Sequence, residues 1–143
     1  MAKVLVVDDD PDMRLAISSV LKSRGYEVIE ASNGYEALDR LKKERLDIML
    51  LDLLMPGMDG FAVIKELEGC KEKGYPDIPV LVISSVREEA SQRRYELELG
   101  RKLAVDDYIE KPIEPFVLLH RVEKLLSKGG RDAQAKAKQD SGH

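Results

Sequence analysis

The chain has 143 residues, of which 43% are hydrophobic and 35% charged, a composition that fits one folded domain and excludes a disordered chain. Its net charge of −4 argues against a nucleic-acid binder, and no apolar run reaches the roughly 20 residues that cross a bilayer. With no signal-peptide pattern after Met1 and a single cysteine, Cys70, we expect a cytoplasmic protein without a membrane segment or internal disulfide.

Short continuous apolar runs alternate with amphipathic stretches along the chain. The runs predicted as strands are Val4–Val7, Val28–Ile29, Ile48–Leu51, Val80–Ile83 and Tyr108–Ile109. Apolar residues at helical spacing follow the first, second, third and fifth runs. A charged helical stretch from about Glu88 to Lys102 follows the fourth run. This alternation predicts an α/β fold: a five-stranded parallel sheet, doubly wound as (βα)5 in the flavodoxin-like strand order 2-1-3-4-5.

Helix boundaries are marked by residues of the expected types. Asp10 precedes a proline, Asn33 precedes the second helical stretch and Asp59 precedes the third, so each is predicted to cap a helix. Gly25 follows the first helical stretch, where a left-handed residue commonly ends a helix. Residues 127–143 contain alanine as their only apolar residue type. We therefore predict one domain over residues 1–126 and a flexible tail over residues 127–143.

Polar side chains follow the predicted strands at the points where functional groups gather in open parallel sheets. Asp8 and Asp9 follow the first strand, Asp52 the third and Ser84 the fourth, and Lys111 comes soon after the fifth. If the strands have the flavodoxin-like order, strands one and three are neighbours, and the three aspartates converge in one crevice.

Three carboxylates in a confined crevice repel one another unless a cation binds or some stay protonated. Oxygen ligands suit Mg²⁺, or Mn²⁺, which favours one or two carboxylates together with a phosphate. Asp52 lies at the centre and can act as a carboxylate nucleophile, while Ser84 and Lys111 can each bind a phosphoryl oxygen. The residues therefore predict phosphoryl transfer.

Four segments resemble the receiver domain of two-component response regulators, over about residues 3 to 126. They are Val6–Asp9, Leu51–Gly60 with its D-x-x-M-P-x-M-D-G pattern, Pro79–Ser85, and Asp106–Pro112 with its terminal Lys-Pro. The resemblance implies that Asp52 is the phosphoacceptor and that its donor is a sensor histidine kinase or a histidine phosphotransfer protein. It does not imply an enzyme in the usual sense, because such a domain catalyses only its own phosphorylation and dephosphorylation.

The resemblance also implies a role for the other matching residues. Asp9 would bind Mg²⁺ directly and Asp8 mainly through water, with Asp52 and the Leu54 carbonyl oxygen completing the set. Ser84 would be the switch hydroxyl, Lys111 the lysine that contacts the phosphoryl group, and Tyr108 the switch aromatic. The peptide bond between Lys111 and Pro112 would be cis.

Two features depart from the family pattern. The 24 positions from Ser84 to Tyr108 exceed the usual spacing, so we expect a longer helix or loop there and leave the output partner and a phosphorylation-dependent homodimer open. Leu54 and Val86, which lie two residues after Asp52 and Ser84, are apolar and cannot orient water. We expect this to prolong the life of the aspartyl phosphate.

No DNA-binding motif follows residue 126, so we expect output through protein–protein contact, as in single-domain regulators of the chemotaxis or phosphorelay type. Two alternatives remain. A haloacid-dehalogenase-like phosphatase also uses an aspartate nucleophile, but its second aspartate would stand where this chain has Leu54. A receiver-fold binding module that is never phosphorylated is the other. A calcium loop starting at Asp8 fails, because its sixth and twelfth positions are Met13 and Ser19.

Overall fold

Five parallel strands form a single sheet, as the sequence predicts. The computed structural model describes residues 1–68 and 70–140, without the side chains of residues 70, 71, 86, 87 and 128–140. The strands are β1 (Lys3–Val7), β2 (Glu27–Ala31), β3 (Ile48–Asp52), β4 (Val80–Ser84) and β5 (Asp107–Glu110). Their order is β2-β1-β3-β4-β5 and every neighbouring pair is parallel, which confirms the flavodoxin-like prediction.

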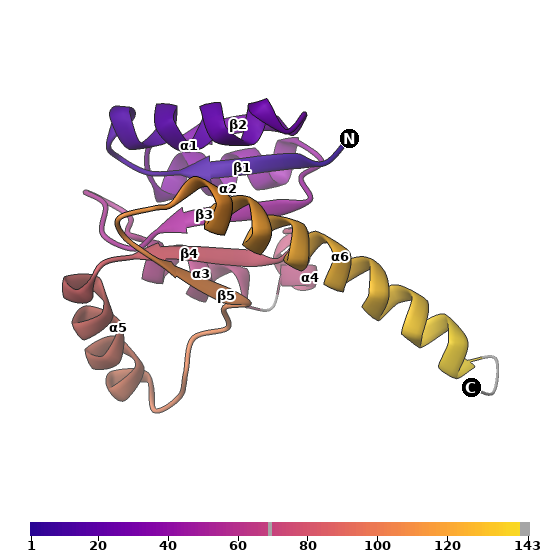
Figure 1. Ribbon diagram of the computed structural model, residues 1–143. Helices are drawn as coiled ribbons and strands as arrows, with labels where there is room; N and C mark the ends of the chain where they lie inside the picture. The colour runs from indigo at the N-terminus through magenta and orange to yellow at the C-terminus, as the bar shows by residue number, and fades with distance from the viewer. Residues whose placement is uncertain (69, 141–143) are drawn as a thin grey trace.

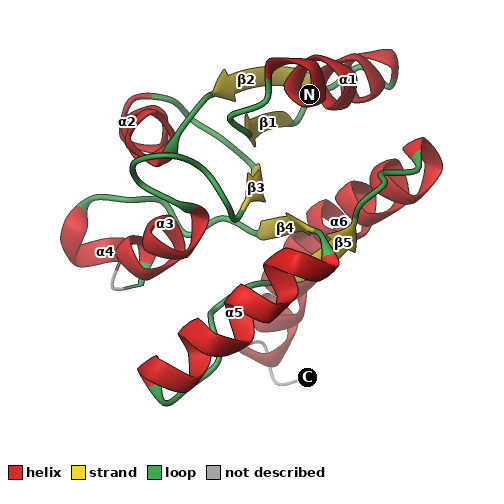
Figure 2. Cartoon of the chain, turned by 90° about the vertical axis from the view of Figure 1, so that its left-hand side faces the viewer, coloured by secondary structure: helices red, strands yellow, loops and turns green. Residues whose placement is uncertain are grey.

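The helices cover both faces of the sheet (Figure 1). They are α1 (Pro11–Ser23), α2 (Gly34–Lys43), α3 (Gly60–Leu67), α4 (Cys70–Lys73), α5 (Val86–Leu99) and α6 (Pro115–Asp140). Figure 2 shows α1 and α6 on one side of the strands, with α2 and α3 on the other. The short helix α4 adds one helix to the five that the apolar pattern predicts, and its four residues are too few to show a helical period.

The two faces of the sheet build two separate parts of the core. Leu5 and Val7 point into the cluster formed with α2 and α3, whereas Val4 and Val6 point into the cluster formed with α1 and α6. All four side chains are almost completely buried. A strand buried on both faces needs apolar residues at consecutive positions, which is why β1 is a continuous apolar run instead of an alternating one.

Side-chain caps begin the helices where the sequence predicts. The Asp12 backbone N–H donates to Oδ1 of Asp10 at 3.0 Å, and Asn33 and Asp59 accept from backbone N–H groups in the first turns of α2 and α3. Each cap satisfies an N–H that has no partner inside its helix. Gly25, after α1, has a φ of +83°.

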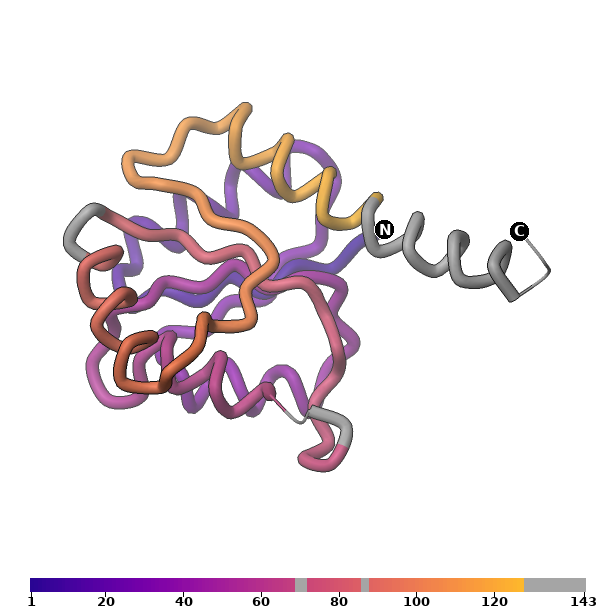
Figure 3. Tube along the Cα trace, turned by 90° about the horizontal axis from the view of Figure 1, so that it is seen from below, coloured from indigo at the N-terminus to yellow at the C-terminus, as the bar shows by residue number. Residues whose placement is uncertain are grey.

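The segment between β4 and β5 contains a helix and a loop. Helix α5 begins after Ser85 and ends at Leu99, before Gly100, whose φ of +74° is left-handed. The helix therefore begins and ends nearer the N-terminus than the predicted range of about Glu88 to Lys102. Ser85 caps its start, and Gly100 readily adopts the left-handed conformation that ends it. Figure 3 follows the trace from this helix through residues 101–106 into β5.

Helix α6 extends to Asp140 and thus includes most of residues 127–143, while residues 141–143 lie outside the described residues. The division into a domain of residues 1–126 and a tail of residues 127–143 stays a prediction. No helix in the described part of the chain combines the length and the hydropathy needed to span a bilayer.

Candidate functional site

Three aspartates meet at the carboxyl ends of β1 and β3, which are neighbours in the sheet. Asp8 and Asp9 directly follow β1, and Asp52 is the last residue of β3. One carboxylate oxygen from each lies within 4.8 Å of the other two. Asp8 and Asp52 are each 2% exposed, whereas Asp9 is exposed to solvent. The structure therefore brings together the aspartates that the sequence singles out, and we call this group the acidic pocket.

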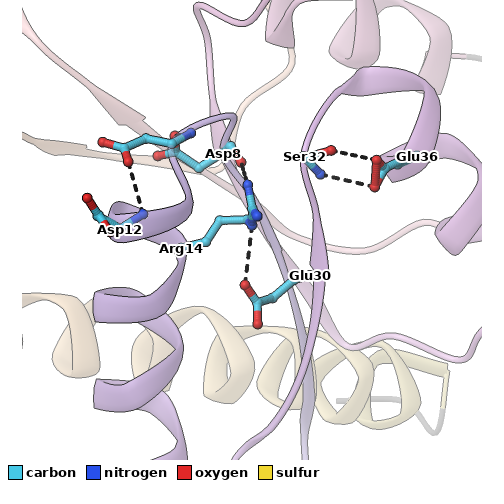
Figure 4. Close-up of polar contacts among 7 residues, drawn as sticks. Asp8, Asp12, Arg14, Glu30, Ser32 and Glu36 are labelled. Atoms are coloured by element: carbon cyan, nitrogen blue, oxygen red, sulfur yellow. Dashed lines mark hydrogen bonds and ion pairs between the residues drawn. The ribbon is translucent and has the colours of Figure 1, made fainter.

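Local hydrogen bonds hold the end of β1 in place. The Asp10 backbone N–H donates to Oδ1 of Asp8 at 2.9 Å, and Nη1 of Arg14 donates to the Asp8 carbonyl oxygen at 2.7 Å. Arg14 also forms an ion pair with Glu30 at 3.3 Å and so links α1 to β2, as Figure 4 shows. These bonds fix the main chain and the side chain of Asp8 at the end of β1. Its Oδ2 atom is buried and has no hydrogen-bond partner among the described residues.

Gly60 fixes the main chain around Asp52. Its N–H donates to the Leu53 carbonyl oxygen at 2.8 Å. A Cβ atom built on Gly60 would lie 2.7 Å from Cα of Leu53 and closer still to the Asp52 carbonyl oxygen. Only glycine allows the start of α3 to pack this tightly against the end of β3. The D-x-x-M-P-x-M-D-G pattern therefore ends in a residue that the backbone of the pocket requires.

Lys111 reaches the acidic pocket from the loop after β5. Its Nζ lies 3.3 Å from Oδ1 of Asp52 and 3.6 Å from Oε1 of Glu88. The bond between Lys111 and Pro112 is cis, as the resemblance implies. The Lys111 N–H donates to the Ser84 carbonyl oxygen at 2.7 Å, and Ser84, at the end of β4, is 1% exposed. The ends of β3, β4 and β5 therefore meet at one edge.

The charges in the pocket shift one another's ionisation. Burial raises the pKa of Asp52 to about 7, and the Asp8 and Glu88 carboxylates add to the rise while the Lys111 ammonium opposes it. Burial also raises the pKa of Asp8. Partial burial lowers the pKa of Lys111, but the surrounding carboxylates, Asp52 first, outweigh it and raise the pKa overall. A buried carboxylate whose charge is not fully compensated favours a bound cation.

The donor set fits Mg²⁺. The acidic pocket offers carboxylate oxygens, the ligands that hard divalent cations prefer, and the Oδ2 atom of Asp8 is a buried acceptor left without a donor among the described residues. When the carboxylates of Asp8, Asp9 and Asp52 are ionised, the single positive charge of Lys111 leaves an excess of negative charge in the pocket. A divalent cation would remove that excess and satisfy the orphaned oxygen.

Tyr108 lies on β5 with 38% of its surface exposed. Its hydroxyl accepts a hydrogen bond of 2.6 Å from Nε2 of Gln92, a residue of α5 that is largely buried. Leu54, two residues after Asp52, is also 38% exposed, and the side chain of Val86 lies outside the described residues. The hydrogen bond from Gln92 holds Tyr108 toward α5.

Glu88 and Gln92 contact Lys111 and Tyr108 of the predicted site, although the sequence pattern assigns neither of them a role there. Glu88 is 5% exposed and closes a capping box with Ser85 at the start of α5. The Ser-x-x-Glu spacing of a capping box is visible in the sequence and predicts where the helix begins. It does not reveal that the glutamate reaches the lysine after β5, because that contact depends on how α5 sits on the sheet.

Comparison with known proteins agrees with this geometry. The sequence profile of the response regulator receiver domain matches residues 4–123. The response regulator MprA of Mycobacterium tuberculosis is 38% identical over 124 residues, which are 87% of this chain and 50% of MprA. Protein PilH of Pseudomonas aeruginosa is 28% identical over 127 residues, 89% of this chain and 99% of PilH. The chain thus spans about half the length of MprA but nearly all of PilH.

A solved structure extends the likeness to the fold. The signal receiver domain of a signal transduction histidine kinase from Syntrophus aciditrophicus is 34% identical, has a TM-score of 0.74, and is matched over 90% of this chain and 92% of that domain. The aspartates at the ends of β1 and β3, the lysine after β5 and the sequence profile all lead to one family. The chain belongs to the receiver domains of response regulators.

Proposed function

We propose that this receiver domain is a phosphoacceptor switch, in which Asp52 takes a phosphoryl group from a phosphohistidine of a sensor histidine kinase or a histidine phosphotransfer protein. The observation that carries the proposal is the position of the Asp52 carboxylate, buried between two other carboxylates and the Lys111 ammonium. A nucleophile in such surroundings is already faced by the group that would neutralise phosphoryl oxygens.

The transfer forms one bond and breaks another. An oxygen of the ionised Asp52 carboxylate attacks the phosphorus, the phosphorus–nitrogen bond to the donor imidazole breaks, and the released nitrogen takes up a proton. Lys111 binds one phosphoryl oxygen and the Ser84 hydroxyl donates to another. Asp8, Asp9, Asp52 and the Leu54 carbonyl oxygen would hold Mg²⁺, which supplies positive charge that offsets the carboxylates and the phosphoryl oxygens.

The return step is hydrolysis of the acyl phosphate. Water attacks the phosphorus, the bond to the Asp52 oxygen breaks, and inorganic phosphate leaves with the Asp52 carboxylate restored. The side chain of Leu54 has no polar atom that could orient this water, so we expect the phosphorylated form to persist. In this proposal the chain catalyses only its own phosphorylation and dephosphorylation.

The output passes through β5 and its neighbouring helices. When the Ser84 hydroxyl turns toward the phosphoryl group, the space beside it opens and Tyr108 can move inward. This movement breaks the hydrogen bond from Gln92. Val117 on α6 is 42% exposed and lines a surface pocket together with Tyr108, so a protein partner can sense the change by direct contact. A cytoplasmic setting and output without direct DNA contact by this domain complete the proposal.

Incubation with acetyl phosphate and Mg²⁺, followed by intact-mass measurement, tests the proposal. We expect the mass of one phosphoryl group to be added to the wild-type chain, and no addition when a chelator removes the metal before the donor is supplied. The Asp52→Asn variant should stay unmodified. Equal labelling of this variant would overturn the assignment of Asp52, and an unlabelled wild-type chain would favour the binding module that is never phosphorylated.

A further inference from the structure

Glu88 lies beside the acidic pocket, and the proposed phosphoryl transfer gives it no role. It belongs to the first turn of α5, yet its Oε1 lies 3.6 Å from Nζ of Lys111. The same ammonium lies 3.3 Å from Oδ1 of Asp52. Lys111 is therefore shared between the phosphoacceptor and a glutamate that arrives from a different element.

The second oxygen of this carboxylate makes a different contact. Oε2 of Glu88 accepts from the Ser85 backbone N–H at 3.0 Å, and the Glu88 backbone N–H donates to the Ser85 hydroxyl at 3.3 Å. Because these two bonds satisfy N–H groups that have no partner inside the helix, they define where α5 begins. One glutamate thus connects Lys111 to the first turn of α5.

Phosphorylation changes the charge balance at this point. A phosphoryl group on Asp52 replaces one carboxylate charge by a group of higher negative charge and draws on Lys111. Glu88 is 5% exposed, so water screens its repulsion from the phosphoryl oxygens poorly. The carboxylate cannot keep its share of Lys111 without facing this repulsion, and it is free to leave only by giving up its bond to Ser85.

We propose, resting on the phosphoacceptor function above, that Glu88 is a positioning residue for Lys111. In the resting state it holds the Lys111 ammonium and repels an arriving phosphoryl group. When the Glu88 carboxylate is displaced, the displacement reaches the first turn of α5. The charge of Glu88 stabilises the unphosphorylated form. Phosphorylation displaces the carboxylate from Lys111 and weakens the cap that Ser85 and Glu88 form together.

Binding of beryllium trifluoride, a phosphoryl mimic, with Mg²⁺ present tests this inference on the full chain. Glu88→Gln keeps the length of the side chain and an oxygen that can accept from Ser85, so the cap survives while the charge is lost. We expect this variant to bind the mimic about tenfold more tightly than the wild type, equivalent to about 1.4 kcal/mol. The matched control is Glu89→Gln, which removes the same charge one residue further along α5 and should change the affinity less than about twofold.

The amide resonance of Ser85 gives a second readout, which a merely structural role of Glu88 would not move. In the wild type, the mimic should shift this resonance because the Glu88 carboxylate, which accepts from the Ser85 N–H, moves away. In Glu88→Gln the shift should be smaller, since the uncharged glutamine side chain is not repelled by the mimic. Equal affinity and an equal Ser85 shift in the two proteins would overturn the inference while leaving the proposed function intact. A wild-type chain that binds no mimic would overturn the proposed function itself.

Discussion

Replacing Asp52 by asparagine removes the most strongly perturbed carboxyl group of the acidic pocket. Burial and the neighbouring Asp8 and Glu88 raise its pKa from 3.8 to about 7. Since each pH unit is worth about 1.4 kcal/mol, ionising this group in the folded state costs about 4 kcal/mol relative to the unfolded chain. The asparagine amide carries no charge and escapes most of that cost.

The sign follows from the direction of the shift. Well below pH 4 the carboxyl is protonated in both states, so it adds no penalty. As the pH rises from about 4 to about 7, the unfolded chain releases the proton while the folded chain retains it, and the free energy of unfolding falls. Above pH 7 the penalty is complete. Asp52→Asn should therefore stabilise the protein chiefly at neutral and alkaline pH.

Urea denaturation at pH 4.5 and pH 8, both with a metal chelator, measures the difference. We expect the stability gained by Asp52→Asn to be about 3 kcal/mol larger at pH 8 than at pH 4.5. Adding Mg²⁺ at pH 8 should stabilise the wild type more than the Asp52 variant. A gain that does not change with pH, or a loss of stability at pH 8, would refute the reasoning.

Three further predictions concern residues around the acidic pocket and Tyr108. Burial raises the pKa of Tyr108, and the hydrogen bond from Gln92 to its hydroxyl lowers it. Gln92→Ala removes this bond, so the pKa of Tyr108 should rise further in an NMR titration of the ring. An unchanged pKa would contradict the hydrogen bond. Gly60→Ala forces a Cβ against the main chain of Asp52 and should lower the free energy of unfolding by about 1–3 kcal/mol in urea and slow labelling by acetyl phosphate; wild-type values would show that the close approach is not needed. Leu54→Asn places a polar side chain near the acyl phosphate, and the lifetime of the phosphorylated form, measured by mass spectrometry, should be shorter. An equal or longer lifetime would show that the side chain at position 54 does not limit attack by water.

The sheet order and most of the pocket are readable from the sequence, because they depend on local patterns. Consecutive apolar residues such as those of β1 occur where a strand is covered on both faces, and right-handed crossovers then leave few ways to arrange five such strands. The carboxyl ends of parallel strands lie at one edge of the sheet, so Asp8 and Asp52 had to meet once β1 and β3 were neighbours. Caps such as Asp10 act within four residues and are equally visible.

The tertiary structure alone decided which groups share Lys111 and hold Tyr108. In the sequence, Glu88 and Gln92 look like ordinary members of a charged helix. Glu88 contacts Lys111 and Gln92 contacts Tyr108, and both contacts depend on how α5 lies across β4 and β5. The raised pKa of Asp52 likewise depends on burial, a property of the packed molecule. Sequence patterns record neighbours along a helix or strand, whereas desolvation and contacts between distant residues exist only after the elements have packed.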